Sequence, residues 1–150
     1  MKNRQTTLLV LQLKRLVAFF YDVMVLAGLL IVAGFLYLGI QTLLQGSDVV
    51  EPGSLLFQLY LALIIFGYVY ISWRRAGQTI GMKAWRLRAI GTDGQPLTFG
   101  QILIRFLVGL LSFGLAGAGY WWSFFDASGR SVPEILSGTE TQLVTKISNP

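Results

Sequence analysis

Long apolar runs alternate with shorter polar stretches along the chain, and this alternation predicts its fold. The three apolar runs cover about residues 17–44, 55–73 and 101–125. About 20 apolar residues are enough to cross the ~30 Å hydrocarbon core of a bilayer, so each run predicts a membrane segment. A polar insert at 74–100 separates the second run from the third, and a tail follows at 126–150. The pattern therefore predicts an all-α integral membrane protein, with three transmembrane segments in one domain over residues 1–150.

The insert at 74–100 has its own pattern of local structure. Apolar and basic residues alternate within residues 84–90, which predicts a short β-strand. The Gly-Thr-Asp-Gly sequence that follows has the composition of a turn. Thr98 and Gln101 match a capping box at the start of a helix. We expect this helix to begin near Phe99 at the membrane surface and to continue as the third membrane segment.

The third apolar run leaves two topologies open, because it contains four glycines within residues 109–119. If the run spans the membrane, the C-terminus lies outside the cytoplasm. If it breaks near Gly114 and re-enters, the C-terminus returns to the cytoplasmic side, where Glu134 joins the basic layer. Ser131 and Glu134 match a second capping box. Residues 141–147 predict either a final strand or a loose tail.

Composition supports a membrane location and narrows the chemistry. Hydrophobic residues make up 54% of the chain and charged residues 13%, against about 25% charged in typical soluble domains. The sequence has no cysteine and no histidine, which removes thiol nucleophiles, imidazole bases and the common zinc ligand sets. We therefore predict a protein that is not an enzyme and that uses no metal and no cofactor.

The distribution of charge predicts the orientation of the protein in the membrane. The net charge is +5, but the cations gather at the ends of the apolar runs and form no separate basic face, so we predict no nucleic-acid partner. The insert at 74–100 carries five cations and one acid, whereas the loop at 45–54 carries two acids and no cation. Lysine and arginine are enriched in cytoplasmic loops. The N-terminus and the insert are therefore expected in the cytoplasm.

Three charged residues lie in or beside the apolar runs. Asp22 is costly there, by roughly 2.5–3.5 kcal/mol at mid-membrane and less near a helix end. Arg15 stands seven residues earlier, about 10 Å along the helix axis, which is too far for an ion pair within one helix. We expect Arg15 at the lipid headgroups. Arg105 lies one to two turns inside the third run, and we expect it to pair with Asp22.

The expected pair of Asp22 and Arg105 supports two interpretations. It either fixes the docking of the first and third helices or allows Asp22 to bind or relay a cation or proton. A catalytic dyad of Asp22 and Asp126 is disfavoured, because a spanning third segment puts the two carboxylates at opposite faces of the membrane. Only a third segment that doubles back would bring them together. A glycine-rich stretch follows the second run, but it lacks the spacing of a phosphate-binding loop, so we predict a turn. Its residues are Gly77, Gln78, Thr79 and Gly81.

The order and spacing of these residues resemble the RDD family of bacterial membrane proteins. Arg15 and Asp22 match an arginine that opens the first span of that family and an aspartate within the span. The stretch at 77–83 matches the Gly-Gln-Thr-x-Gly turn after the second span. The Asp-Gly turn at 93–94 and then Arg105 match the elements that lead into the third span. The resemblance covers nearly the whole chain.

The last acidic position of the family has two candidates in this chain. The family has an aspartate shortly before a Gly-Thr element. Here Glu134 precedes Gly-Thr at 138–139, and Asp126 is the alternative.

The resemblance implies a multi-pass protein of the bacterial inner membrane, surrounded by the lipid bilayer. It suggests a transporter or transport subunit for an unknown ion or small ligand. Three helices fill their own interior, so we expect a homo-oligomer or a partner membrane protein. The alternative function is that of a non-catalytic structural or assembly subunit in a larger membrane complex.

Overall fold

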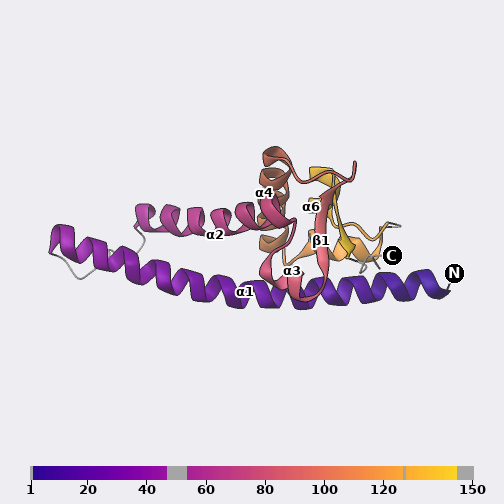
Figure 1. The fold of residues 1–150 in the computed structure, drawn as a ribbon, viewed down its shortest axis with the longest axis horizontal. Helices are drawn as coiled ribbons and strands as arrows, with labels where there is room; N and C mark the ends of the chain where they lie inside the picture. Colours follow the sequence, from indigo (N-terminus) through magenta and orange to yellow (C-terminus); the bar gives the residue numbers. More distant parts are fainter. Residues whose placement is uncertain (1, 47–53, 127, 145–150) are drawn as a thin grey trace, which may run out of the picture.

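The protein consists of a long helical hairpin and a layer of shorter elements at one end of it. The computed structural model describes residues 2–46, 54–126 and 128–144. Helix α1 (Lys2–Gln45) runs the length of the molecule, and α2 (Leu55–Ala76) lies along its C-terminal half (Figure 1). Residues 23–45 of α1 together with α2 are termed the hairpin. The described residues from 77 to 144, which gather beside the N-terminal half of α1, are termed the C-terminal layer.

The C-terminal layer is built from short elements around one longer helix. They are, in chain order, α3 (Ile80–Ala84), β1 (Leu87–Gly91), α4 (Phe99–Gly114), α5 (Ala118–Trp121), the 3-10 turn η1 (Trp122–Phe124), α6 (Val132–Ser137) and β2 (Thr139–Leu143). The strands β1 and β2 form an antiparallel pair, with Leu87 opposite Leu143 and Gly91 opposite Thr139. The strand predicted at 84–90 is thus present with shifted ends, and a short helix that the sequence did not predict precedes it. Of the predicted segment at 141–147, the part from 145 lies outside the described residues.

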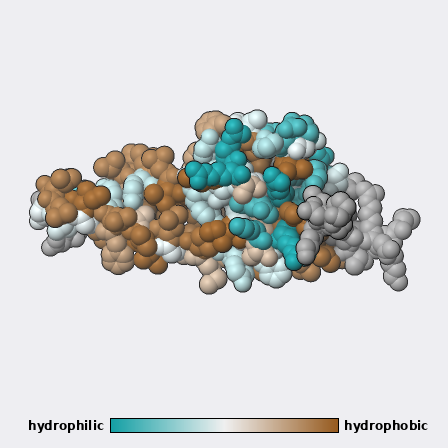
Figure 2. All heavy atoms as spheres, viewed as in Figure 1, coloured by the Kyte–Doolittle hydropathy of each residue, from teal (hydrophilic) through white to brown (hydrophobic). Residues whose placement is uncertain are grey.

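The hairpin has the surface of a membrane-embedded structure. Two helical stretches are long and apolar enough to cross a bilayer, Leu9–Leu44 and Leu55–Ala76. Large apolar side chains on the hairpin stay exposed, among them Phe35 and Leu43 at 72% and 86%, and Figure 2 shows the resulting apolar surface. In lipid such a surface is favourable, because hydrocarbon replaces water around it. The all-α membrane fold expected from the sequence is therefore confirmed.

Helix α1 is longer than a membrane crossing requires. Its 44 residues extend for about 66 Å at 1.5 Å per residue, roughly twice the hydrocarbon thickness. Helix α2, with 22 residues, matches a single crossing of about 30 Å. The N-terminal part of α1 therefore extends past the end of α2, and there it packs against the C-terminal layer (Figure 1).

The third apolar segment is bent. Helix α4 begins at the predicted capping box of Thr98 and Gln101, and Leu97 and Ile102, which flank the box, are fully buried. The helix ends at Gly114, and its axis makes an angle of 106° with that of the following helical turns. The connection includes two residues of positive φ, Ala116 at 53° and Gly117 at 77°. The segment is thus either a broken span or a re-entrant element, as the four glycines allowed.

The hydrophobic core lies in the C-terminal layer, where it meets α1. Its buried apolar side chains come from α3, β1, the loop before α4 and α4 itself, and α1 adds Ala18 at 2% exposure. Leu143 of β2 is partly buried and packs against this core. Trp73 and Tyr70, near the end of α2, pack against it. Hydrophilic residues cover this part of the surface in Figure 2. The molecule thus has a conventional buried core at one end and an outward-facing apolar surface at the other.

Candidate functional site

Asp22 connects α1 to the end of α2 and to α3. Its Oδ1 accepts hydrogen bonds from the Tyr68 hydroxyl at 2.8 Å and from the backbone N–H of Gly81 at 2.9 Å. Its Oδ2 accepts from the Thr79 hydroxyl at 2.5 Å. All three donors are uncharged. Hydrogen bonds to the ionised form compensate a carboxylate for the loss of water, so Asp22 is stabilised without a cationic partner.

The first half of the glycine-rich turn connects α2 to strand β1. Gly77 ends α2 in the left-handed conformation, with φ of 67°. A Cβ atom there would also lie 2.7 Å from the carbonyl oxygen of Ala89, so only glycine fits. The side chain of Gln78 donates to the carbonyl of Leu87 at 2.6 Å. This stretch links α2 to β1, as expected of the predicted turn, although Gly81 of that turn lies in helix α3. The bond from Gln78 holds β1 beside the end of α2.

The second half of the turn packs directly onto α1. Thr79 is the N-cap of α3, and its hydroxyl accepts from the backbone N–H of Met82 at 3.2 Å. A Cβ at Gly81 would lie 2.1 Å from the carbonyl oxygen of Ala18 and 2.9 Å from the Asp22 carboxylate. Glycine is thus required at position 81 because the backbones of α1 and α3 nearly touch. The Asp22 carboxylate and the glycine-rich turn form a single structural unit.

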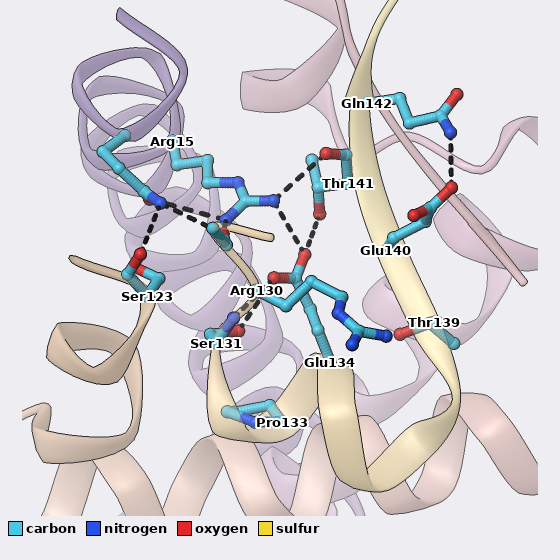
Figure 3. A network of polar contacts seen from close by, with 12 residues as sticks. Arg15, Ser123, Arg130, Ser131, Pro133, Glu134, Thr139, Glu140, Thr141 and Gln142 are labelled. Atoms are coloured by element: carbon cyan, nitrogen blue, oxygen red, sulfur yellow. Dashed lines mark hydrogen bonds and ion pairs between the residues drawn. The ribbon is translucent and has the colours of Figure 1, made fainter. Parts of the chain in front are cut away.

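Glu134 is the centre of a second, charged cluster. Its Oε1 lies 3.1 Å from the Arg15 guanidinium and 3.2 Å from that of Arg105, and it accepts from the Thr141 hydroxyl at 2.5 Å. Its Oε2 accepts from the backbone N–H and the hydroxyl of Ser131 at 2.8 and 3.1 Å. Figure 3 shows Arg15 and Thr141 converging on this carboxylate. Glu134 is only 2% exposed, so the cluster is an internal one.

The two arginines of this cluster are held from several sides. Arg15 also donates to the backbone carbonyls of Gly129 at 2.8 Å and Thr141 at 3.1 Å. Arg105 donates to the hydroxyls of Thr139 at 2.5 Å and Thr141 at 2.8 Å. The guanidinium of Arg105 also lies over the ring of Trp73, 5.0 Å from its centroid, a cation–π contact. Glu134 therefore links α1, α4 and the C-terminal strand.

The environment of Glu134 favours its ionised form. Burial disfavours the charge, but the positive charges of Arg105 and Arg15 and the hydrogen bonds from Thr141 and Ser131 outweigh burial. Together they hold the pKa of Glu134 below its usual value. The side chain is thus a carboxylate between two guanidinium groups, and the three groups together carry one positive charge.

The ion pair expected between Asp22 and Arg105 is wrong, and Arg15 has a partner that the sequence did not predict. Asp22 and Arg105 form no ion pair with each other, because Arg105 contacts Glu134 and Asp22 contacts neutral donors. Arg15, which was expected at the lipid headgroups, turns inward to Glu134, and its side chain is 18% exposed. The physical reason is the return of the chain after the bent segment, which brings a second carboxylate between the two arginines.

Glu134 and Asp126, the two candidates for the last acidic position of the family, make different contacts. Glu134 completes the predicted capping box of α6 and also receives both arginines. Asp126 accepts from the backbone N–H groups of Ser128 and Arg130 at 3.0 and 2.9 Å, and so closes a local turn. The described contacts of Asp126 include neither Arg15 nor Arg105.

Several partners in the two clusters were missed at the level of sequence. Neither Tyr68 nor Thr141 is among the site residues predicted from the sequence, and Thr139 enters there only as part of the Gly-Thr element. A usable signal exists for the threonines, because alternate residues of a strand share one face and both are buried on the same face of β2. Nothing in the sequence signals the contact of Tyr68, since it depends on the packing of α2 against α1.

A cavity of about 520 Å³ lies between α1 and the C-terminal layer. Its walls are mostly apolar, with contributions from Leu13, Phe113 and Phe124 among others. Four charged side chains also line it: Arg15, Asp22, Arg105 and Glu134. This space is termed the central cavity. Among residues 2–46, 54–126 and 128–144, no group of three or more acidic, histidine or cysteine side chains is arranged to hold a metal ion.

Fold and site together define a helical membrane protein. It has an Arg–Glu–Arg cluster, and next to it a glycine-rich stretch that is hydrogen-bonded to the Asp22 carboxylate. The sequence profile of the RDD family matches residues 10–138. The chain therefore belongs to the RDD family, and the matched residues include Asp22, Arg15, Arg105 and Glu134 but end before Thr139 and Thr141. Neither the curated proteins nor the solved structures contain a match to the chain.

Proposed function

We propose that the protein is a ligand-binding subunit for transport in a bacterial inner membrane, with the central cavity as its site for an ion or small molecule. The observation that carries the proposal is that both charged clusters line this one cavity. Its volume of about 520 Å³ lies within the roughly 300–1,000 Å³ of small-molecule sites. Mostly apolar walls with a few convergent polar groups are also typical of such sites.

Transport by this protein requires a second copy or a partner membrane protein. Residues 23–44 and 55–73, which form the apolar part of the hairpin, carry no charged side chain. Their polar groups bond locally: Gln41 donates to the Tyr37 hydroxyl at 3.1 Å, and Tyr60 donates to the carbonyl of Ala33 at 3.2 Å. One chain therefore offers a binding site at one end and no continuous polar route along the hairpin.

The arrangement of the strands supports a topology with both ends of the protein in the cytoplasm. The basic insert favours a cytoplasmic location for β1 by the positive-inside rule. Strand β2 is hydrogen-bonded to β1, and the two strands of a pair lie on the same side of a membrane. The bent segment between them then enters and leaves the bilayer on one side. This topology places the central cavity at the cytoplasmic surface.

The proposal is tested by filling the central cavity without changing its charges. Leu13 and Leu36 both lie on α1 and are 62% and 58% exposed, but only Leu13 lines the cavity. In proteoliposomes under proton, sodium or potassium gradients, we expect ion flux in the wild type and in Leu36→Trp, and a strong loss of flux in Leu13→Trp. Equal flux in both variants would contradict a role for the cavity.

A structural or assembly subunit is the second candidate function. It is favoured by the contacts of the four charged side chains, each of which already has partners within the chain. Apolar side chains of α4 and η1, such as Leu111 and Phe124, are also exposed at 69% and 53% and are available to a partner helix or to lipid. Absence of flux under all three gradients, in wild-type protein that is folded and oligomeric, would overturn transport of these ions by the protein without a partner and would favour this second function.

A further inference from the structure

A second hollow, separate from the central cavity, lies where α3 meets the ends of the two strands. It has a volume of about 320 Å³ and is lined by Gln78, Lys83, Arg86 and Val144. This space is termed the cationic hollow. Lys83 and Arg86 are both exposed. Neither forms an ion pair with an acid in the part of the chain that the structure describes.

Arg86 occupies a backbone conformation that normally belongs to glycine. Its φ is 56°, in the left-handed region that is unfavourable for residues with a Cβ atom. The residue follows the C-cap of α3, and its N–H donates to the carbonyl of Lys83 at 3.3 Å. Glycine is the standard residue at such a helix end. An arginine here retains strain that glycine would remove, and strained residues cluster at functional sites.

The hollow lies close to the end of a membrane helix. Helix α2 ends with Arg74 and Arg75 in its last turn, and α3 begins a few residues later and packs against α1 beside Asp22. Ile80 of α3 is 54% exposed, as expected of a side chain facing the lipid boundary. The insert as a whole has five cations and one acid, so it attracts a negatively charged membrane surface.

We propose that the cationic hollow binds the phosphate group of an anionic membrane phospholipid, of the phosphatidylglycerol class. Lys83 and Arg86 form no ion pair with an acid among residues 2–46, 54–126 and 128–144, and they supply two positive charges to a concave surface. The left-handed backbone of Arg86 lies at the junction of α3 and β1. The bound headgroup would hold the insert and α3 against the membrane surface. This role is independent of any ligand in the central cavity.

The binding test uses purified protein in detergent and native mass spectrometry with added phosphatidylglycerol or phosphatidylcholine. We expect a preference for the anionic lipid of roughly tenfold or more, because each cation near an anionic surface favours binding several-fold. Lys83→Gln should remove most of this preference. Arg75→Gln is the matched control, since it removes the same charge from an exposed residue outside the hollow. Equal losses in the two variants would overturn a specific site.

Arg86→Gly separates lipid binding from folding. The variant should bind phosphatidylglycerol more weakly and yet unfold at a higher temperature, because glycine relieves the left-handed strain. Unchanged lipid preference in folded Arg86→Gly would overturn the proposal.

Inorganic phosphate, added in increasing concentration, distinguishes a lipid headgroup from free phosphate as the anion that binds. If free phosphate displaces the lipid completely at equal concentration, the hollow is a site for soluble phosphate and the assignment to a lipid is wrong.

Discussion

Partly buried Asp22 and fully buried Glu134 line the same cavity, but the two carboxylates are stabilised in different ways. Asp22 accepts from two hydroxyls and one backbone N–H, and no cation contacts it among the described residues. Glu134 lies between two guanidinium groups and carries hydrogen bonds as well. Asp22 is thus stabilised by hydrogen bonds from neutral groups, whereas Glu134 is stabilised mainly by two positive charges.

This difference indicates how each acid contributes to the structure. Asp22 joins α1 to the end of α2 and to the start of α3, so its loss should disturb only the packing of these neighbouring elements. Glu134 joins α1, α4 and β2, and it separates two positive charges that would otherwise face each other. Removing one member of a buried ion pair leaves the remaining charge uncompensated. The comparison predicts unequal effects of the same chemical change at the two sites.

The largest effect is expected for Glu134→Gln. The substitution keeps the shape of the side chain but leaves Arg15 and Arg105 without their counter-ion, which should lower the free energy of unfolding by about 3–5 kcal/mol. Denaturation by SDS in mixed micelles measures this change. The control is Glu140→Gln on β2, an acid whose described contact is with Gln142. A cost for Glu134→Gln no larger than that of the control would show that the cluster is not stabilising.

A smaller but still large effect is expected for Gly81→Ala. The new Cβ would meet the carbonyl oxygen of Ala18 at 2.1 Å, so α3 must move away from α1, and overpacking of this kind costs about 1–3 kcal/mol. Gly100→Ala, on α4 with no atom within 4 Å of its Cβ, should instead be neutral or stabilising. The same SDS titration compares the two variants. A neutral result at position 81 would contradict the close contact of α1 and α3.

Asp22→Asn should cost less than either change. The amide keeps one acceptor oxygen but places an N–H₂ group against donors, so about 1–2 kcal/mol should be lost, as for one unsatisfied buried hydrogen bond. Protection of the backbone N–H of Gly81 from hydrogen exchange should fall at the same time. If Asp22→Asn destabilises the protein as much as Glu134→Gln, the distinction between a dipolar and a charged environment is wrong.

The smallest expected effect is a difference in acid sensitivity. The pKa of Glu134 is lowered in the folded protein from an ordinary value of 4.5, so the ionised side chain stabilises the fold above that pH. This contribution is lost as the pH falls through the lower, folded-state pKa. Thermal unfolding of the wild type should therefore become easier below about pH 4.5, whereas Glu134→Gln should lack this part of the pH dependence. Parallel curves for the two proteins would contradict the ion cluster.

Local features of the structure were predictable from the sequence, and distant contacts were not. The capping boxes at Thr98 and Ser131 depend on residues three positions apart, and both are present. The glycine-rich link from α2 to β1 could also be predicted, because its residues are adjacent in the sequence. The partner of Arg105 depends instead on the bend after Gly114 and on the register of β2 with β1. Neither the bend nor the register can be derived from local pattern. For this reason the sequence predicted Asp22 as the partner of Arg105, whereas the structure pairs Arg105 with Glu134.

A cross-link between the two strands tests whether the chain returns after the bent segment to the side on which it began. Arg88 and Gln142 are directly opposite each other in the β1–β2 pair, at a Cα separation of about 4.5–5.5 Å that suits a disulfide. The chain has no cysteine of its own, so the double variant Arg88→Cys with Gln142→Cys contains only the two introduced thiols. The variant is oxidised in native membranes. A disulfide is then detected as the failure of both thiols to react with polyethylene glycol maleimide. Arg88→Cys combined with Leu43→Cys, at the far end of the hairpin, is the control. We expect a cross-link in the first variant only. Two reactive thiols in the first variant, as in the control, would place β2 apart from β1 and contradict the return of the chain.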